Sequence, residues 1–188
     1  MRFILVTGAL ALATACTPPA TQNSAQTASA GCALSVTTPW RPLSGTEFTI
    51  EASTMGADCA KAVATIVIRD MQGYALWAQA YNTEHIMLLA PAHASEAMRT
   101  ALAEWIDPAN NTTLQLTGAL PEWPANADQP ANGEFPFYPD QGVDRESYNA
   151  FRAANTPMFC YVQGMESLAC IALSNGEMSQ VGVQLFPG

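Results

Sequence analysis

The chain has 188 residues, of which sixteen are acidic and only seven are basic, so its formal net charge at neutral pH is −9. A surface with this charge balance repels phosphate backbones, which argues against a nucleic acid partner. It also lacks the basic face that binds anionic lipid. After the N-terminal segment, no apolar run reaches the roughly 18 residues that a transmembrane helix needs.

The first sixteen residues combine a basic start, an apolar run and small residues before a cysteine. Met1 and Arg2 precede an apolar run over residues 3–15, and Cys16 follows directly. This order is typical of a secretory signal peptide, here residues 1–15. The stretch LATAC, which ends in Cys16, resembles the signal of bacterial lipoproteins. That resemblance implies cleavage before Cys16 and attachment of lipid to its side chain; no family is indicated for the rest of the chain.

The segment after Cys16 is rich in Pro, Thr, Ser, Gln and Ala and has no core-forming residues. Such a composition buries too little apolar surface to offset its ordering entropy, so residues 16–31 are predicted to be a disordered tether. A single globular domain is expected over residues 32–188. The lipoprotein resemblance implies membrane attachment through lipid, on the periplasmic side of the envelope. By resemblance to lipoprotein sorting rules, Thr17 rather than Asp after Cys16 favours the outer membrane.

Four cysteines remain once Cys16 is set aside: Cys32, Cys59, Cys160 and Cys170. An even number in an exported chain favours two disulfides, for which three pairings are possible. We favour Cys32–Cys59 and Cys160–Cys170, because the members of each pair are close in sequence and flanked by strand patterns.

The first half of the domain is predicted to consist mainly of strands. Residues 46–53 alternate strictly between apolar and polar side chains, and residues 33–38 do so weakly. Residues 63–69 and 74–81 predict a hairpin, which we place centrally in a sheet because apolar residues occur on both of its sides. Residues 85–90 fit either a strand or the approach to a helix.

Two helices are expected, over residues 95–106 and 144–155. Ser95 is the predicted N-cap of the first, and Asp107-Pro108 ends it. Asp144 is the predicted N-cap of the second, with Val143 and Tyr148 forming a hydrophobic staple around it.

Four further strands are predicted, at residues 112–117, 158–163, 168–173 and 180–186. A long loop rich in proline and aromatic residues follows the first of these strands, over residues 118–142. The fold is therefore expected to be α+β, mainly antiparallel sheet with two helices. The alternative is a β-sandwich in the first half with the helices as insertions.

The long loop holds the leading candidates for function. Trp123, Phe137 and Tyr138 predict a surface that binds an envelope protein or cell-wall glycan without catalysis. Glu134, Asp140 and Asp144 lie in or beside the same loop, and a close pair of them would suit glycan hydrolysis. A periplasmic glycan hydrolase is therefore the alternative function.

A third and weaker candidate is a metal site at His85, Met87 and His93, whose side chains are ligands for copper or zinc. Their spacing matches no known ligand pattern, and Pro91 separates the two histidines. No nucleophile motif or phosphate-binding loop occurs, so no cofactor is expected.

Overall fold

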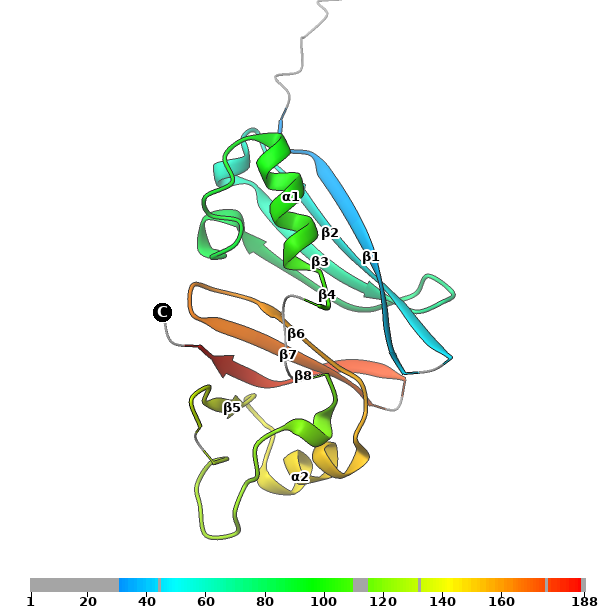
Figure 1. The fold of residues 1–188 in the computed structure, drawn as a ribbon, viewed down its shortest axis with the longest axis vertical. Helices are drawn as coiled ribbons and strands as arrows, with labels where there is room; N and C mark the ends of the chain where they lie inside the picture. The colour runs from blue at the N-terminus through cyan, green and yellow to red at the C-terminus, as the bar shows by residue number, and fades with distance from the viewer. Residues whose placement is uncertain (1–30, 44, 110–114, 132, 175, 187–188) are drawn as a thin grey trace, which may run out of the picture.

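A computed structural model describes residues 31–43, 45–109, 115–131, 133–174 and 176–186. Its eight strands form two antiparallel four-stranded sheets, accompanied by two α-helices (Figure 1). The first sheet has the order β1-β2-β3-β4, with β1 at Leu34–Leu43, β2 at Thr46–Met55, β3 at Val63–Arg69 and β4 at Ala75–Asn82. The second has the order β5-β8-β7-β6, with β5 at Phe137–Pro139, β6 at Met158–Val162, β7 at Ser167–Ser174 and β8 at Glu177–Leu185. The α+β prediction is confirmed.

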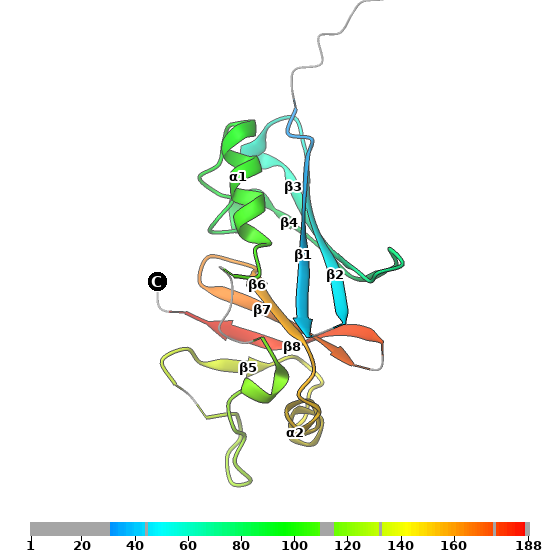
Figure 2. The same cartoon turned by 45° about the vertical axis from the view of Figure 1, so that its right-hand side comes forward.

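The first half of the chain makes one sheet, not a sandwich of its own. Apolar and polar side chains alternate along β2. Its buried face carries Phe48, Ile50 and Ala52, and its other face carries Glu47, Thr49 and Glu51. Helix α1, Ser95–Trp105, packs on β1 and β2 from the buried side, as Figure 2 shows. The open face holds paired polar groups, including the ion pair between Arg69 and Glu51 at 3.3 Å.

The second sheet is covered on both faces, which explains why all five residues of β6 are buried. Phe159 and Tyr161 point into the large core shared with the first sheet and α1. Met158 and Cys160 point to the opposite side, into a smaller core with helix α2, Arg145–Ala154. A strand buried on both faces carries apolar residues at consecutive positions instead of alternate ones.

Both predicted disulfides are present. Cys32–Cys59 ties the start of β1 to the short 3-10 helix at Cys59–Lys61, with a Cα–Cα distance of 4.8 Å. Cys160 and Cys170 lie directly opposite each other on β6 and β7, with a Cα–Cα distance of 4.0 Å. On the chain-entropy account these two loops stabilise the fold by about 3.5 and 3 kcal/mol at most.

Several local predictions are wrong. Ser95 is the first helical residue of α1 and not its cap, because the first helical hydrogen bond runs from the N–H of Met98 to the carbonyl of Ala94 at 2.8 Å. The hairpin of β3 and β4 is not central, since β4 is an edge strand. Of the two alternatives for residues 85–90, the strand is wrong: after the 3-10 helix Thr83–His85 the chain makes tight turns on its way to α1, with Ile86 and Leu89 fully buried.

The predicted strand at 112–117 lies partly outside the described residues. Its described end makes an isolated bridge between Leu116 and Pro157 and then enters the 3-10 helix Thr117–Ala119. The prediction for α2 is confirmed in detail: the Asp144 carboxylate accepts a hydrogen bond from the N–H of Ser147 at 2.8 Å, and Val143 packs against the cluster that contains Tyr148.

Candidate functional site

The long loop is built into the fold through the short strand β5, which pairs with β8. Gly182 of β8 makes that pairing possible, because a Cβ at this position would collide with the carbonyl oxygen of Tyr138 and the ring of Phe137. Since strand side chains alternate, Phe137 points into the smaller core while Tyr138 points away from it. Phe137 is fully buried and Tyr138 is 40% exposed.

Tyr148 of α2 fastens the loop from the other side. Its hydroxyl donates to the carbonyl of Pro121 at 2.9 Å, and its ring meets Trp123 edge-on at 5.4 Å and Phe137 at 6.0 Å. Burial strongly raises the pKa of Tyr148, so this hydroxyl remains a donor throughout the neutral range. Arg152 adds a second fastening with a hydrogen bond to the carbonyl of Leu120 at 3.0 Å.

These contacts separate the three predicted binding aromatics. Phe137 belongs to the core, and Trp123 is half-buried, with its indole N–H donating to the carbonyl of Ala127 at 3.0 Å. Phe137 is therefore enclosed by the fold, and the hydrogen bond of Trp123 holds that side chain against its own loop. Tyr138 alone of the three is exposed.

Four exposed apolar residues lie on chain segments that meet beside β5, and we call them the β5–β8 patch: Phe135, Tyr138, Met165 and Leu185. Their exposed fractions are 45%, 40%, 55% and 37%, respectively. The N–H of Leu185 donates to the carbonyl of Pro136 at 2.9 Å, and the N–H of Phe186 donates to the carbonyl of Glu166 at 3.2 Å. Three chain segments therefore meet at this end of the second sheet.

Sequence reasoning identified Tyr138 in this patch and missed the other three residues. Phe135 lies in the predicted loop, and Met165 lies between two predicted strands. Leu185 lies in the predicted strand at residues 180–186, whose pairing with β5 no local pattern indicates. The pairing of β5 with β8 and the hydrogen bond between Phe186 and Glu166 bring their chain segments together.

Two of the three predicted acids, Asp144 and Asp140, hold structural hydrogen bonds. Asp144 is occupied as the cap of α2, and the hydrogen bond from the Ser147 backbone lowers its pKa, the opposite of what a general acid needs. The Asp140 carboxylate accepts from the Nε2 of Gln180 at 3.3 Å, which ties it to β8. Glu134 is exposed on the loop.

The predicted metal ligands lie on the surface around the turns after β4. The side chain of His85 is 68% exposed and lies 3.7 Å from Glu84, while His93 and Met87 are also exposed. Across the described ranges, no group of three or more His, Cys, Asp or Glu side chains is placed to hold a metal ion. The metal candidate therefore gains no support from geometry.

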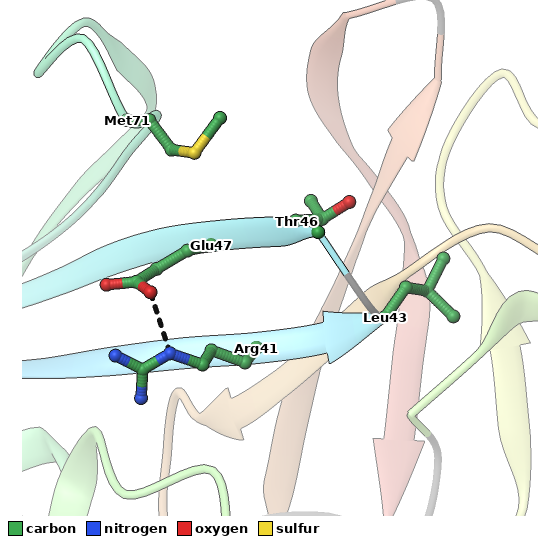
Figure 3. A pocket seen from close by; sticks show the side chains of 6 residues that line it. Arg41, Leu43, Thr46, Glu47 and Met71 are labelled. Carbon is green, nitrogen blue, oxygen red and sulfur yellow. Dashed lines mark hydrogen bonds and ion pairs between the residues drawn. The ribbon is translucent and has the colours of Figure 1, made fainter.

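Two hollows lie on the surface near the tip of the β1–β2 hairpin. The larger, of about 410 Å³, is lined by Leu43, Met71 and the ion pair of Arg41 with Glu47, whose Nε and Oε2 are 2.7 Å apart (Figure 3). The charges in this hollow already satisfy each other. The smaller, of about 240 Å³, is lined by residues that include Trp40, Pro108 and Phe159.

A scan against protein-family models gave no match, and searches of curated proteins and of solved structures likewise found no relative. Cys16 and the predicted tether up to residue 30 lie outside the described residues. Within the described residues, no helix has the length and apolar character needed to cross a membrane. The structure thus defines the class of this protein as a two-sheet α+β fold with two disulfides and an exposed apolar patch.

Proposed function

We propose that this protein is a lipid-anchored envelope protein that binds a partner protein through the β5–β8 patch, without catalysis. The anchor is the lipid that the lipoprotein resemblance implies on Cys16, and the tether at residues 16–31 would hold the domain on the periplasmic side of the membrane, the outer membrane being favoured. The two disulfides agree with an oxidising compartment.

The observation that carries the binding role is the β5–β8 patch itself. Exposed apolar side chains that occur singly need no explanation, but four from three separate segments at one end of a sheet suit an interaction site. Aromatic residues and Met are enriched where proteins meet, which favours a protein over a glycan as the partner. The network around Tyr148 holds β5 in place, so the patch would bind with little ordering cost.

The test is site-specific photo-crosslinking in living cells. A photoreactive phenylalanine analogue at Tyr138 is expected to give a discrete crosslinked product, and the same analogue at Leu43, which is also exposed but lies at the end of β1, is expected to give none. Adding Leu185→Glu to the Tyr138 probe should remove the product, because a carboxylate would then have to be desolvated within the contact. Equal products from both probe positions would contradict a dedicated patch.

The anchor has a separate test. Metabolic labelling with radioactive palmitate should mark the wild-type chain and leave Cys16→Ser unlabelled, and only the wild type should sediment with membranes. Unlabelled wild-type protein would remove the anchor and leave the binding role of the patch to be judged by crosslinking alone.

A further inference from the structure

The edges of the two sheets differ in how well they are protected against strand addition. Backbone groups at a sheet edge are unpaired, and proteins usually block them with proline, charge or a covering segment. On β1, Pro39 has no N–H to offer, and the side chain of Arg99 donates to the carbonyl of Ser35 at 3.4 Å. The N–H of Cys32 donates to the carbonyl of Gly56, so this pair and every second pair along β1 and β2 are the hydrogen-bonded ones. Ser35 and Pro39 belong to the pairs in between, so their backbone groups point away from β2, toward the outer edge of β1.

The two edges of the second sheet are also protected. The N–H of Met158 on β6 donates to the carbonyl of Gln115 at 2.9 Å, and the carbonyl of Val162 accepts from the indole of Trp105 at 2.7 Å. At the other edge, β5 is only three residues long, begins after Pro136 and ends in Pro139.

The remaining edge, β4, has no charged residue or proline between positions 71 and 82. Among the described residues it pairs only with β3, although β8 of the second sheet lies close to part of it. A register shift disturbs its first end, near Ala75, while the pairing from Trp77 to Asn82 is regular. The consecutive residues Ala78, Gln79 and Ala80 are all exposed.

The hydrogen-bond phase shows which backbone groups β4 offers. The N–H of Thr83 donates to the carbonyl of Ala62 at 3.0 Å, so this pair and every second pair along the ladder are the hydrogen-bonded ones. Tyr81, Gln79 and Trp77 therefore bond to β3. Ala78 and Ala80 present their N–H and carbonyl groups outward, and no hydrogen bond from another part of the described chain meets them there.

The edge is also held rigid by its neighbours. The indole of Trp77 donates to the hydroxyl of Tyr161 at 3.2 Å, and the hydroxyls of Tyr81 and Tyr161 are 2.8 Å apart. Because Tyr161 is fully buried in β6, these bonds fix both half-buried aromatics of β4 against the second sheet. A strand that is already ordered loses little entropy when another strand joins it.

We propose that β4 binds an extended segment of a partner protein by strand addition, with Ala78 and Ala80 as the backbone contacts. The segment carries apolar side chains at alternate positions, which lie beside Trp77 and Tyr81, and basic residues at its ends. Charge complementarity supports the basic ends, because the chain has a net charge of −9 and the uncharged stretch lies between Asp70 and Glu84. This surface is distinct from the β5–β8 patch and does not depend on it.

A second copy of the chain fits this edge less well. Two molecules of the same strong negative charge would have to approach each other, and a single strand pair covers far less than the roughly 1,000 Å² that a stable dimer buries. An added peptide strand pairs with the unpaired backbone groups of β4 and needs no further buried surface.

The test uses a fluorescent ten-residue peptide in which alternating Thr and Val are flanked by two Lys at each end, added to the full-length chain in mild detergent. Binding is measured by fluorescence anisotropy, and amide hydrogen exchange by NMR locates it. We expect exchange at the N–H groups of Ala78 and Ala80 to slow, and exchange at Thr37 on the protected β1 edge to stay unchanged. Replacing the Lys residues of the peptide by Glu should abolish binding.

Two blocked forms make the proposal falsifiable. Ala80→Pro removes one outward N–H and should weaken binding by about tenfold, while Thr37→Pro, at an outward-facing position of β1, should not change it. If Ala80→Pro fails to fold, the wild-type chain with a peptide N-methylated at alternate residues serves instead, and must not bind. Peptide binding without protection at Ala78 and Ala80, or a concentration-dependent dimer that Ala80→Pro abolishes, would overturn the proposal.

Discussion

Tyr161→Phe is the substitution whose effect on stability should change sign with pH. At neutral pH the hydroxyl of Tyr161 accepts from Trp77 and bonds to Tyr81, so its removal leaves two partners without their bond. The expected loss is about 1–2 kcal/mol in the free energy of unfolding. Trp77 and Tyr81 are only half-buried, and water can partly replace the lost partner.

In alkaline solution the same hydroxyl lowers the free energy of unfolding. Burial, reinforced by the neighbouring Tyr81, strongly raises the pKa of Tyr161 in the folded chain, whereas an unfolded tyrosine ionises near pH 10. Above pH 10 the unfolded state therefore binds fewer protons than the folded state, and each such tyrosine reduces stability by about 1.4 kcal/mol per pH unit. Tyr148 and Tyr81, whose pKa values burial also raises, act in the same direction.

Tyr161→Phe removes one of these contributions, so its stability should fall less steeply with pH. The initial deficit of about 1–2 kcal/mol is cancelled about one pH unit above 10, where the two stability curves should cross. Urea unfolding followed by tryptophan fluorescence from pH 7 to pH 11.5 measures this directly, provided that the m-values agree. Phe159→Leu, a buried neighbour with no hydroxyl, is the control that should lower stability equally at every pH. Parallel curves for wild type and Tyr161→Phe would refute the reasoning.

Two further substitutions test how the patch and its supporting helix are held. Gly182→Ala should push β5 off β8, because the new Cβ meets the Tyr138 carbonyl and the Phe137 ring; hydrogen exchange at residues 137–139 should accelerate, and unchanged exchange would contradict the close approach. Asp144→Ala should lower the thermal midpoint at pH 7, and the difference should vanish as the pH falls through the lowered pKa of this carboxyl, because the cap then loses its charge. A difference that persists under strong acid would mean that charge is not what the cap contributes.

Local patterns were enough to predict most of the secondary structure. The strict alternation of β2, the turn at residues 70–73 and the cap and staple of α2 each depend on residues within a few positions of one another. The Cys160–Cys170 pair was predictable for the same reason, since a hairpin brings its two strands together. Ser95 shows the limit of such patterns: a residue type that often caps helices can stand one position after the actual N-cap, Ala94, and the sequence does not distinguish the two positions.

The candidate site shows why the rest was not predictable. Composition marked the long loop as unusual, but it could not tell that Phe137 and Trp123 fasten the loop while Tyr138 faces outward. The patch at Tyr138 depends on Leu185 and Met165, which are distant in sequence and are brought near by sheet pairing. Contacts of this kind leave no local periodicity.

The amino-acid sequence by itself determined the class of fold, because strand alternation and helix caps depend on side chains near one another along the chain. It favoured the observed disulfide pairing among three possibilities, and by resemblance it leads us to expect a lipid on Cys16. The tertiary structure alone decided that β4 is an edge, that the second sheet is buried on both faces, and that Phe137 lies inside while Tyr138 lies outside. The physical reason is that strand order and burial come from packing between distant segments. The free energy of that packing belongs to the assembled sheets and to no single stretch of sequence.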